Sequence, residues 1–177
     1  MGMPLTQQLD LFPDSFVTQC LFKDVKNAAE LRKAAIGGEI SCALINPSMV
    51  VDQFQVLIAA NKALHLQRVG KMKTRSLYSE VIFNLCPTNN ISEAFKKFGI
   101  SDSDSAVLIA VIHTEEDRNN IDAICAKVDG QQIPLDHLAI ISDIPKVKKV
   151  YKVTPTEEAC GSLLDAVVCR MAVKDVL

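Results

Sequence analysis

The chain has 177 residues, which is the usual size of one domain. Lys and Arg number 19 against 21 Asp and Glu, so the sequence lacks the positive field that is typical of a dedicated nucleic-acid coat protein. Hydrophobic residues make up 49%, yet the longest unbroken apolar run, at 106–112, is far shorter than the roughly 18 residues of a membrane span. We therefore expect one soluble domain over residues 1–177 and no membrane partner.

The hydrophobic pattern predicts short strands separated by helices. The strands are expected at 16–22, 40–45, 77–85, 106–112 and 150–153. The helices are expected at 28–36, 53–69, 91–98, 117–129, 138–141 and 155–173. Because the order of strands and helices is irregular, the sequence predicts an α+β single domain with a mixed or antiparallel sheet and several packed helices.

Residues at helix starts give the clearest local signals. Asp52 is expected to cap the helix that follows it, and Asn90 with Glu93 three residues later is typical of a capped start. Thr154 and Glu157 flank Pro155 in the pattern of a capping box with proline in the first turn. These signals fix where the helices begin better than where they end.

The cysteines and histidines indicate no metal site. The six cysteines occur singly among apolar residues, which is typical of buried free thiols, and no two have the C-x-x-C spacing. The start of the sequence has no charged segment followed by an apolar core, so we expect no secretory signal. We expect a protein of the cytoplasm and nucleus.

No catalytic motif is found. The sequence has no G-x-S-x-G elbow and no H-E-x-x-H pair. Gly70, Lys71 and Thr74 resemble part of a phosphate-binding loop, but the upstream glycine is missing and the segment follows a helix rather than a strand. We therefore expect no enzymatic activity, no catalytic residue and no cofactor, although scattered catalytic residues remain a third, weaker hypothesis.

Positive charge is concentrated locally. Residues 53–79 contain no acidic side chain, and their last lysines and arginine crowd together just after Gly70. Such groups can bind phosphates, and nearby amides can bind base edges. The candidate RNA-binding residues are Lys71, Lys73, Arg75, Asn89, Asn90, Lys96 and Lys97. The alternative is a solvated surface, which is also the simpler interpretation of the second cluster, Lys146, Lys148, Lys149 and Lys152.

The last helix carries more apolar side chains than one core-facing stripe needs. The candidate partner-binding residues are Leu163, Leu164, Val167, Val168 and Met171. The alternative is that these side chains all pack inside the core of the chain itself.

Several segments together resemble the small kinase-binding subunits of the KEOPS/EKC complex. They are Ile-Asn-Pro at 45–47, Ala-Ala-Asn-Lys-Ala at 59–63, the basic stretch 70–75, and the segment 80–99. The resemblance covers nearly the whole chain. It implies a non-catalytic subunit that binds the complex's atypical kinase/ATPase, PRPK.

The same resemblance implies a role in tRNA modification. The kinase of that complex contacts the subunit that transfers a threonylcarbamoyl group to an adenosine of tRNA. Archaeal members of the family are thought to hold the acceptor CCA end of tRNA, and typically have Arg, Gln and Ile where this chain has Asn89, Asn90 and Ile91. A direct tRNA-binding module that holds the acceptor end is therefore the alternative function.

Overall fold

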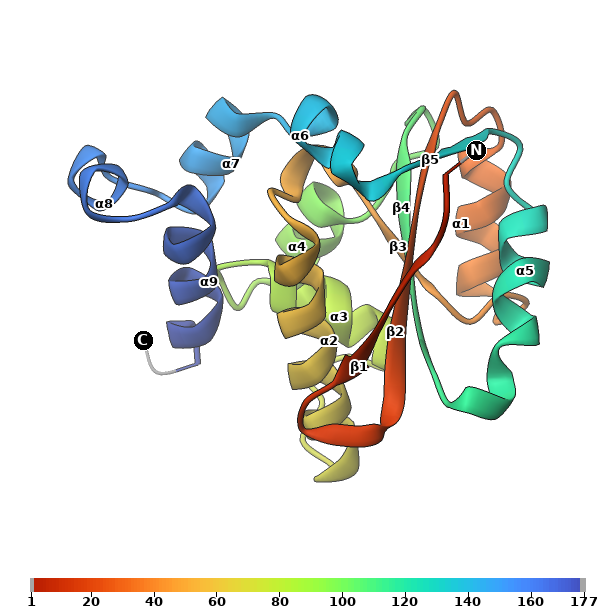
Figure 1. The fold of residues 1–177 in the computed structure, drawn as a ribbon. Helices are drawn as coiled ribbons and strands as arrows, with labels where there is room; N and C mark the ends of the chain where they lie inside the picture. The colour runs from red at the N-terminus through yellow and green to blue at the C-terminus, as the bar shows by residue number, and fades with distance from the viewer. Residues whose placement is uncertain (1, 176–177) are drawn as a thin grey trace.

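A computed structural model describes residues 2–175 of the chain. An antiparallel sheet lies between two helical layers (Figure 1). The strands are β1 (Leu5–Leu9), β2 (Phe12–Lys23), β3 (Ala43–Ile45), β4 (Val107–His113) and β5 (Gln131–Ile133). Their order across the sheet is β1-β2-β4-β3, and β5 pairs with the far end of β2. The predicted α+β class is confirmed.

The helices divide between the two faces of the sheet. They are α1 (Ala28–Ile36), α2 (Gln53–Arg68), α3 (Leu77–Leu85), α4 (Ile91–Phe98), α5 (Asn119–Ala126), α6 (Leu138–Ile141), α7 (Ile144–Val150), α8 (Pro155–Cys160) and α9 (Leu163–Val173). Short 3₁₀ turns lie at Pro47–Met49, Glu115–Asp117 and Leu135–His137. Helices α1 and α5 cover one face, and α2, α3, α4 and α9 lie on the other side (Figure 1). No helix within residues 2–175 is both long and apolar enough to cross a bilayer.

Strand β4 shows why its sequence is a continuous apolar run. Its residues alternate between the two cores: Val107, Ile109 and Val111 pack under α1 and α5. Leu108 and Ala110 pack against the helices of the opposite face. Because both faces of the sheet are covered, both sets of side chains are apolar, as predicted for a central strand buried on two sides.

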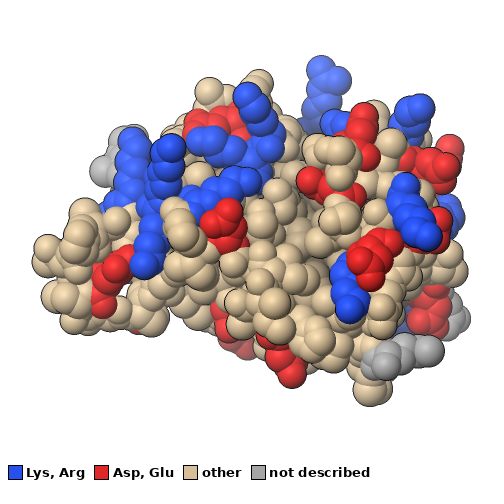
Figure 2. Space-filling model, turned by 90° about the horizontal axis from the view of Figure 1, so that it is seen from above, with Lys and Arg blue, Asp and Glu red and all other residues tan. Residues whose placement is uncertain are grey.

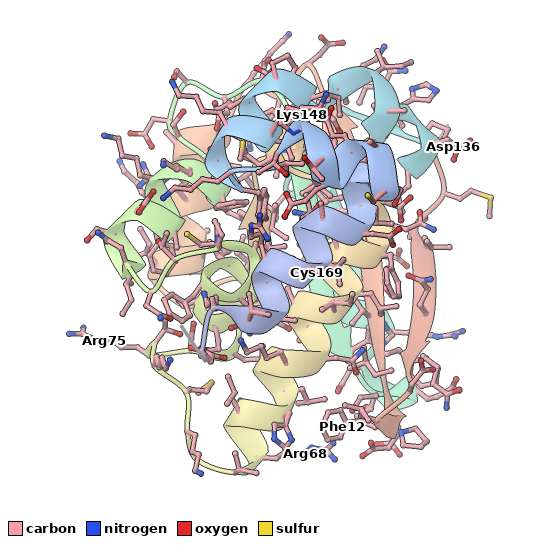
Figure 3. The ribbon with its side chains drawn as sticks, turned by 90° about the vertical axis from the view of Figure 1, so that its left-hand side faces the viewer. Phe12, Arg68, Arg75, Asp136, Lys148 and Cys169 are labelled. Atoms are coloured by element: carbon pink, nitrogen blue, oxygen red, sulfur yellow. The ribbon has the colours of Figure 1, made fainter. Side chains whose placement is uncertain are left out.

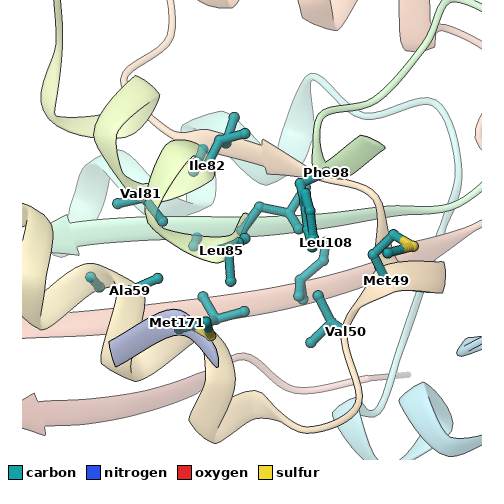
Figure 4. Close-up of a cluster of buried hydrophobic side chains, with 14 of the residues drawn as sticks. Met49, Val50, Ala59, Val81, Ile82, Leu85, Phe98, Leu108 and Met171 are labelled. Carbon is teal, nitrogen blue, oxygen red and sulfur yellow. The ribbon is translucent and has the colours of Figure 1, made fainter. Parts of the chain in front are cut away.

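The larger core lies between the sheet and the helices α2, α3, α4 and α9. Figure 4 shows Met171 of α9 among Val50, Ala59 and Leu85, which come from three separate segments. Tyr151 is fully buried in the same core, donates its hydroxyl hydrogen to the carbonyl of Leu85, and accepts a hydrogen bond from Gln55. The last third of the chain is therefore held to α2 and α3 by packing and by buried polar contacts.

Two predicted strands are helical. Residues 77–85 form α3, which begins at Ser76, whose side chain accepts a hydrogen bond from the backbone N–H of Ser79. All residues from Glu80 to Leu85 are buried. The apolar residues of this helix recur at helical spacing, so the strand prediction used the wrong period; they are Leu77, Tyr78, Val81, Ile82 and Leu85. Residues 150–153 form the end of α7 and a turn, in which Lys152 has a positive φ of 53°.

The predicted helix at 155–173 is divided. Thr154 and Glu157 form the predicted capping box and start α8, but α8 ends at Cys160 and the extended Gly161 separates it from α9. A second capping box, between Ser162 and Asp165, starts α9. This second start resets the direction of the chain and sets which side of α9 faces the core.

The cysteines are only partly as predicted. Cys20, Cys42 and Cys86 are buried free thiols, and Cys125 is half-buried. Cys160 and Cys169 are exposed, because α8 and the outer side of α9 face away from the core. The prediction of burial was therefore wrong for these two residues.

Candidate functional site

The inner and outer sides of α9 separate the predicted partner-binding residues into two groups. Val167 and Met171 are 0% and 2% exposed and belong to the larger core. The prediction that they bind a partner is corrected, because neither side chain reaches the surface. Leu163 is half-buried and packs against the same core. Leu164 and Val168 are half-buried and remain accessible.

The outer side of α9 forms a surface that we call the α9 outer face, composed of Leu164, Val168, Cys169 and Ala172. Cys169 and Ala172 are exposed, and Figure 3 shows Cys169 on the side of the helix that is turned away from the rest of the protein. Two half-buried aliphatic side chains beside these small exposed residues make a weakly polar strip. Such a strip suits contact with another protein better than it suits solvent.

A buried lysine fixes the end of α9. Lys174 is 2% exposed, and its Nζ donates hydrogen bonds to the carbonyl oxygens of Phe83 (2.6 Å), Cys86 (3.0 Å) and Thr88 (3.2 Å). The Nζ also lies 3.6 Å from the centroid of the Phe83 ring. These carbonyls lie in the last turn of α3 and just beyond its C-terminal end, where the helix dipole favours a cation. Burial, with repulsion from Lys62 and Lys73 as a smaller cause, lowers the pKa of Lys174 to about 8.

Residues 71–75, which we call the basic loop, follow α2 after Gly70, whose φ is +68°. The buried carboxylate of Glu80 holds this loop: it accepts hydrogen bonds from the backbone N–H of Lys73 (3.2 Å) and of Thr74 (2.9 Å), and from the Thr74 hydroxyl (2.7 Å). The loop therefore has a defined shape that does not depend on a ligand.

The basic side chains of the loop point outward. Lys71, Lys73 and Arg75 are exposed, and Figure 3 shows Arg75 projecting from the surface. Lys73 forms an ion pair with Asp175 (Nζ–Oδ1 3.1 Å), and Lys62 pairs with the same carboxylate. Among residues 2–175, Lys71 and Arg75 have no acidic partner, so their charges are free for an external phosphate.

The amides predicted to bind RNA have structural roles. Asn90 caps α4, and its Oδ1 accepts a hydrogen bond from the N–H of Glu93 (3.1 Å). Asn89 donates its Nδ2 hydrogen to the carbonyl of Lys174 (3.0 Å). Both side chains are exposed but already bonded, so a nucleotide would have to share or replace these partners.

The lysines of α4 differ from each other. Lys97 is paired with Glu93, four residues earlier, at 2.5 Å. Lys96 is exposed and has no acidic partner within residues 2–175. Of the candidate RNA-binding cations, Lys71, Arg75 and Lys96 are thus free, while Lys73 and Lys97 are paired.

The second basic cluster lies on α7. Figure 2 looks down on the end of the molecule that carries α6 and α7 and shows Lys and Arg side chains gathered there, with acidic residues among them. Lys148 pairs with Glu158 (2.8 Å), and Arg170 pairs with Glu157. The ion pairs of Lys148 and Arg170 therefore join α7 and α9 to α8.

Two candidate surfaces meet at the end of α9. Asp175 pairs with the basic loop, and Lys174 is joined both to the end of α3 and to Asn89. The sequence analysis missed Lys174 and Glu80. Lys174 follows Met171 by three residues and Val167 by seven, so its place on the buried side of the helix could have been read from that spacing. Nothing in the sequence marks Glu80 as buried.

The fold and these surfaces define an α+β protein with an antiparallel sheet between two helical layers, whose candidate sites are a helix face and a basic loop. The chain belongs to the family of kinase binding protein CGI-121, whose model matches residues 22–175. It is 67% identical over 174 residues to the EKC/KEOPS complex subunit TPRKB of Danio rerio, covering 98% of this chain and 99% of that protein. It is 34% identical to the subunit cgi121 of Aspergillus fumigatus, over 86% of this chain and 85% of the relative. It is 32% identical to CGI121 of Candida glabrata, over 86% of this chain and 91% of the relative.

Proposed function

We propose that this chain is a non-catalytic subunit of the EKC/KEOPS complex that binds the kinase of that complex. The observation that carries the proposal is the match to a family described as kinase-binding, together with relatives named as subunits of this complex that align over nearly the whole chain. Within the complex, the subunit supports the atypical kinase/ATPase in the threonylcarbamoyl modification of tRNA. Contact with the transferase subunit is indirect, through the kinase.

We assign the kinase contact to the α9 outer face. This helix is anchored by Val167 and Met171 on its inner side and by Lys174 at its end, so it presents its outer side at a fixed position. A fixed surface loses little conformational entropy on binding.

The exposed thiols Cys160 and Cys169 support a reducing compartment, in agreement with a place in the cytoplasm and nucleus.

The substitutions Val168→Glu and Leu164→Glu test the docking surface. A charge placed in a buried apolar contact between proteins lowers affinity strongly. After co-expression, the amount of kinase that co-purifies with each variant is therefore expected to be at least tenfold lower than with the wild type. Far-UV circular dichroism of the free subunit checks that the fold is kept. Ile140→Glu is the matched control, because Ile140 is 80% exposed on α6. Folded variants that still bind the kinase normally would exclude the α9 outer face.

Direct tRNA binding is the second candidate function, favoured by the free charges of Lys71 and Arg75 on a loop of fixed shape. Alanine at Lys71, Lys73 and Arg75 together is expected to weaken tRNA binding and to reduce the slope of log affinity against log salt by roughly two to three. The measurement is a titration of labelled tRNA at several salt concentrations. Alanine at Lys146, Lys148 and Lys149 removes the same charge from another surface and is the control. Equal slopes for the two triple variants would remove the basic loop from the tRNA hypothesis.

A further inference from the structure

A groove of about 410 Å³ opens beside the β3 edge of the sheet, between α1 on one face and α3 and α4 on the other. Its lining is mainly apolar and includes two large side chains that remain accessible: Ile36 is 81% exposed and Phe95 is 38% exposed. An isoleucine this exposed beside a cavity gains nothing from the core of its own chain. The volume lies in the range of pockets that hold a small ligand or a few residues of a peptide.

The edge of the sheet forms the floor of this groove. Strand β3 pairs with β4 on one side only, and its other side carries a single bridge, between Ile45 and Gly99. Cys42 and Leu44, toward the other end of this segment, line the groove. Cys42, Ala43, Leu44 and Ile45 are each 5% exposed or less, so this segment closes the groove from below and offers no open strand edge to an added chain. Helices α1 and α3 both contact β3, so they stand as walls on its two faces.

The charge around the groove favours an acidic occupant. Arg32 is the one charged side chain among the described residues that line it. Its ion pair with Asp102 (2.6 Å) is exposed on both sides, and such pairs are weak enough for Arg32 to exchange Asp102 for another carboxylate. Arg75 and Lys96, which are free of acidic partners within residues 2–175, directly follow or precede lining residues. The acidic neighbours are Asp102, which pairs with Arg32, and Glu39, against the three basic side chains Arg32, Arg75 and Lys96.

We propose that this groove binds a peptide segment of a partner protein, with a bulky apolar side chain between Ile36 and Phe95 and a carboxylate on Arg32. The apolar walls supply burial, and the arginine supplies the charge preference. This site is separate from the α9 outer face, so a peptide and the kinase can be bound at the same time.

A phage-displayed heptapeptide library, selected on the full chain, tests the proposal. Enriched peptides are expected to combine aromatic or branched aliphatic residues with at least one Asp or Glu. Fluorescein-labelled copies of these peptides are then titrated by fluorescence anisotropy. The Ile36→Glu and Arg32→Glu variants are expected to bind at least tenfold more weakly than the wild type. Ile140→Glu, an exposed isoleucine elsewhere, is expected to bind normally.

A charge exchange and an amide map complete the test. A peptide in which lysine replaces the acidic residue is expected to recover binding to Arg32→Glu by at least threefold, which a merely unfolded variant could not do. Backbone amide shifts of Cys42 and Leu44 are expected to change on peptide addition. Absence of any enriched peptide, enrichment without acidic residues, or shifts confined to other surfaces would overturn the proposal. So would single-stranded RNA that binds the wild type and loses affinity with Ile36→Glu, because the groove would then be a nucleic-acid site.

Discussion

Met171→Ala is expected to lower the free energy of unfolding by about 2–5 kcal/mol. Met171 is 2% exposed and packs among Val50, Ala59 and Leu85, so its removal leaves a cavity where α9 meets α2 and α3 (Figure 4). The chain contains no tryptophan, so urea unfolding is best followed by far-UV circular dichroism. The midpoint should fall while the slope against urea concentration stays the same.

Val168→Ala is the matched control for this prediction. Val168 lies three residues earlier on the same helix but is half-buried and is not part of the core. Its truncation is expected to cost less than about 1 kcal/mol. If the two variants lost equal stability, the assignment of an inner and an outer side to α9 would be wrong. If Met171→Ala were as stable as the wild type, α9 would not be part of the core.

The sequence predicted several helix starts. Asp52, Asn90 and Thr154 each cap a helix as expected, because a cap is a local arrangement of a side chain and the next few backbone N–H groups. The sequence prediction failed for helix α3. Its apolar residues recur at helical spacing, but the segment is short, largely apolar and followed by Pro87, which also fits a strand. Its packing against α2, α4 and the sheet decides between the two.

The sequence predicted which segments carry the candidate surfaces, but not which of their side chains are exposed and which are buried or paired. The last helix does carry an excess of apolar residues, but they are divided between its core side and the α9 outer face. The position at which the Ser162 cap starts α9 decides that Val167 faces the core and Val168 does not. The basic loop was found from its charge alone. That Lys73 is paired with Asp175 depends on where a segment 102 residues later in the chain packs, which local sequence does not encode.

Lys174→Met is expected to destabilise the protein at pH 7 by on the order of 3 kcal/mol. The methionine keeps the length and the apolar stem of the side chain, but it leaves the carbonyls of Phe83, Cys86 and Thr88 without their donor. The end of α3 and the attachment of α9 are both expected to weaken. Urea unfolding compares the two proteins, and an unchanged midpoint would contradict the role of Lys174 as the cap of α3.

The same pair of proteins tests the pKa of this lysine. Burial lowers the pKa of Lys174 from 10.5 to about 8, so between these pH values the unfolded state binds a proton that the folded state has released. The free energy of unfolding must therefore rise with pH across that window, by about 1–3 kcal/mol relative to Lys174→Met. All other titrating groups are shared, so the difference between the two curves isolates this side chain. A difference that stays constant from pH 7 to pH 10 would mean that the carbonyls and the Phe83 ring stabilise the ammonium enough to cancel the cost of its burial.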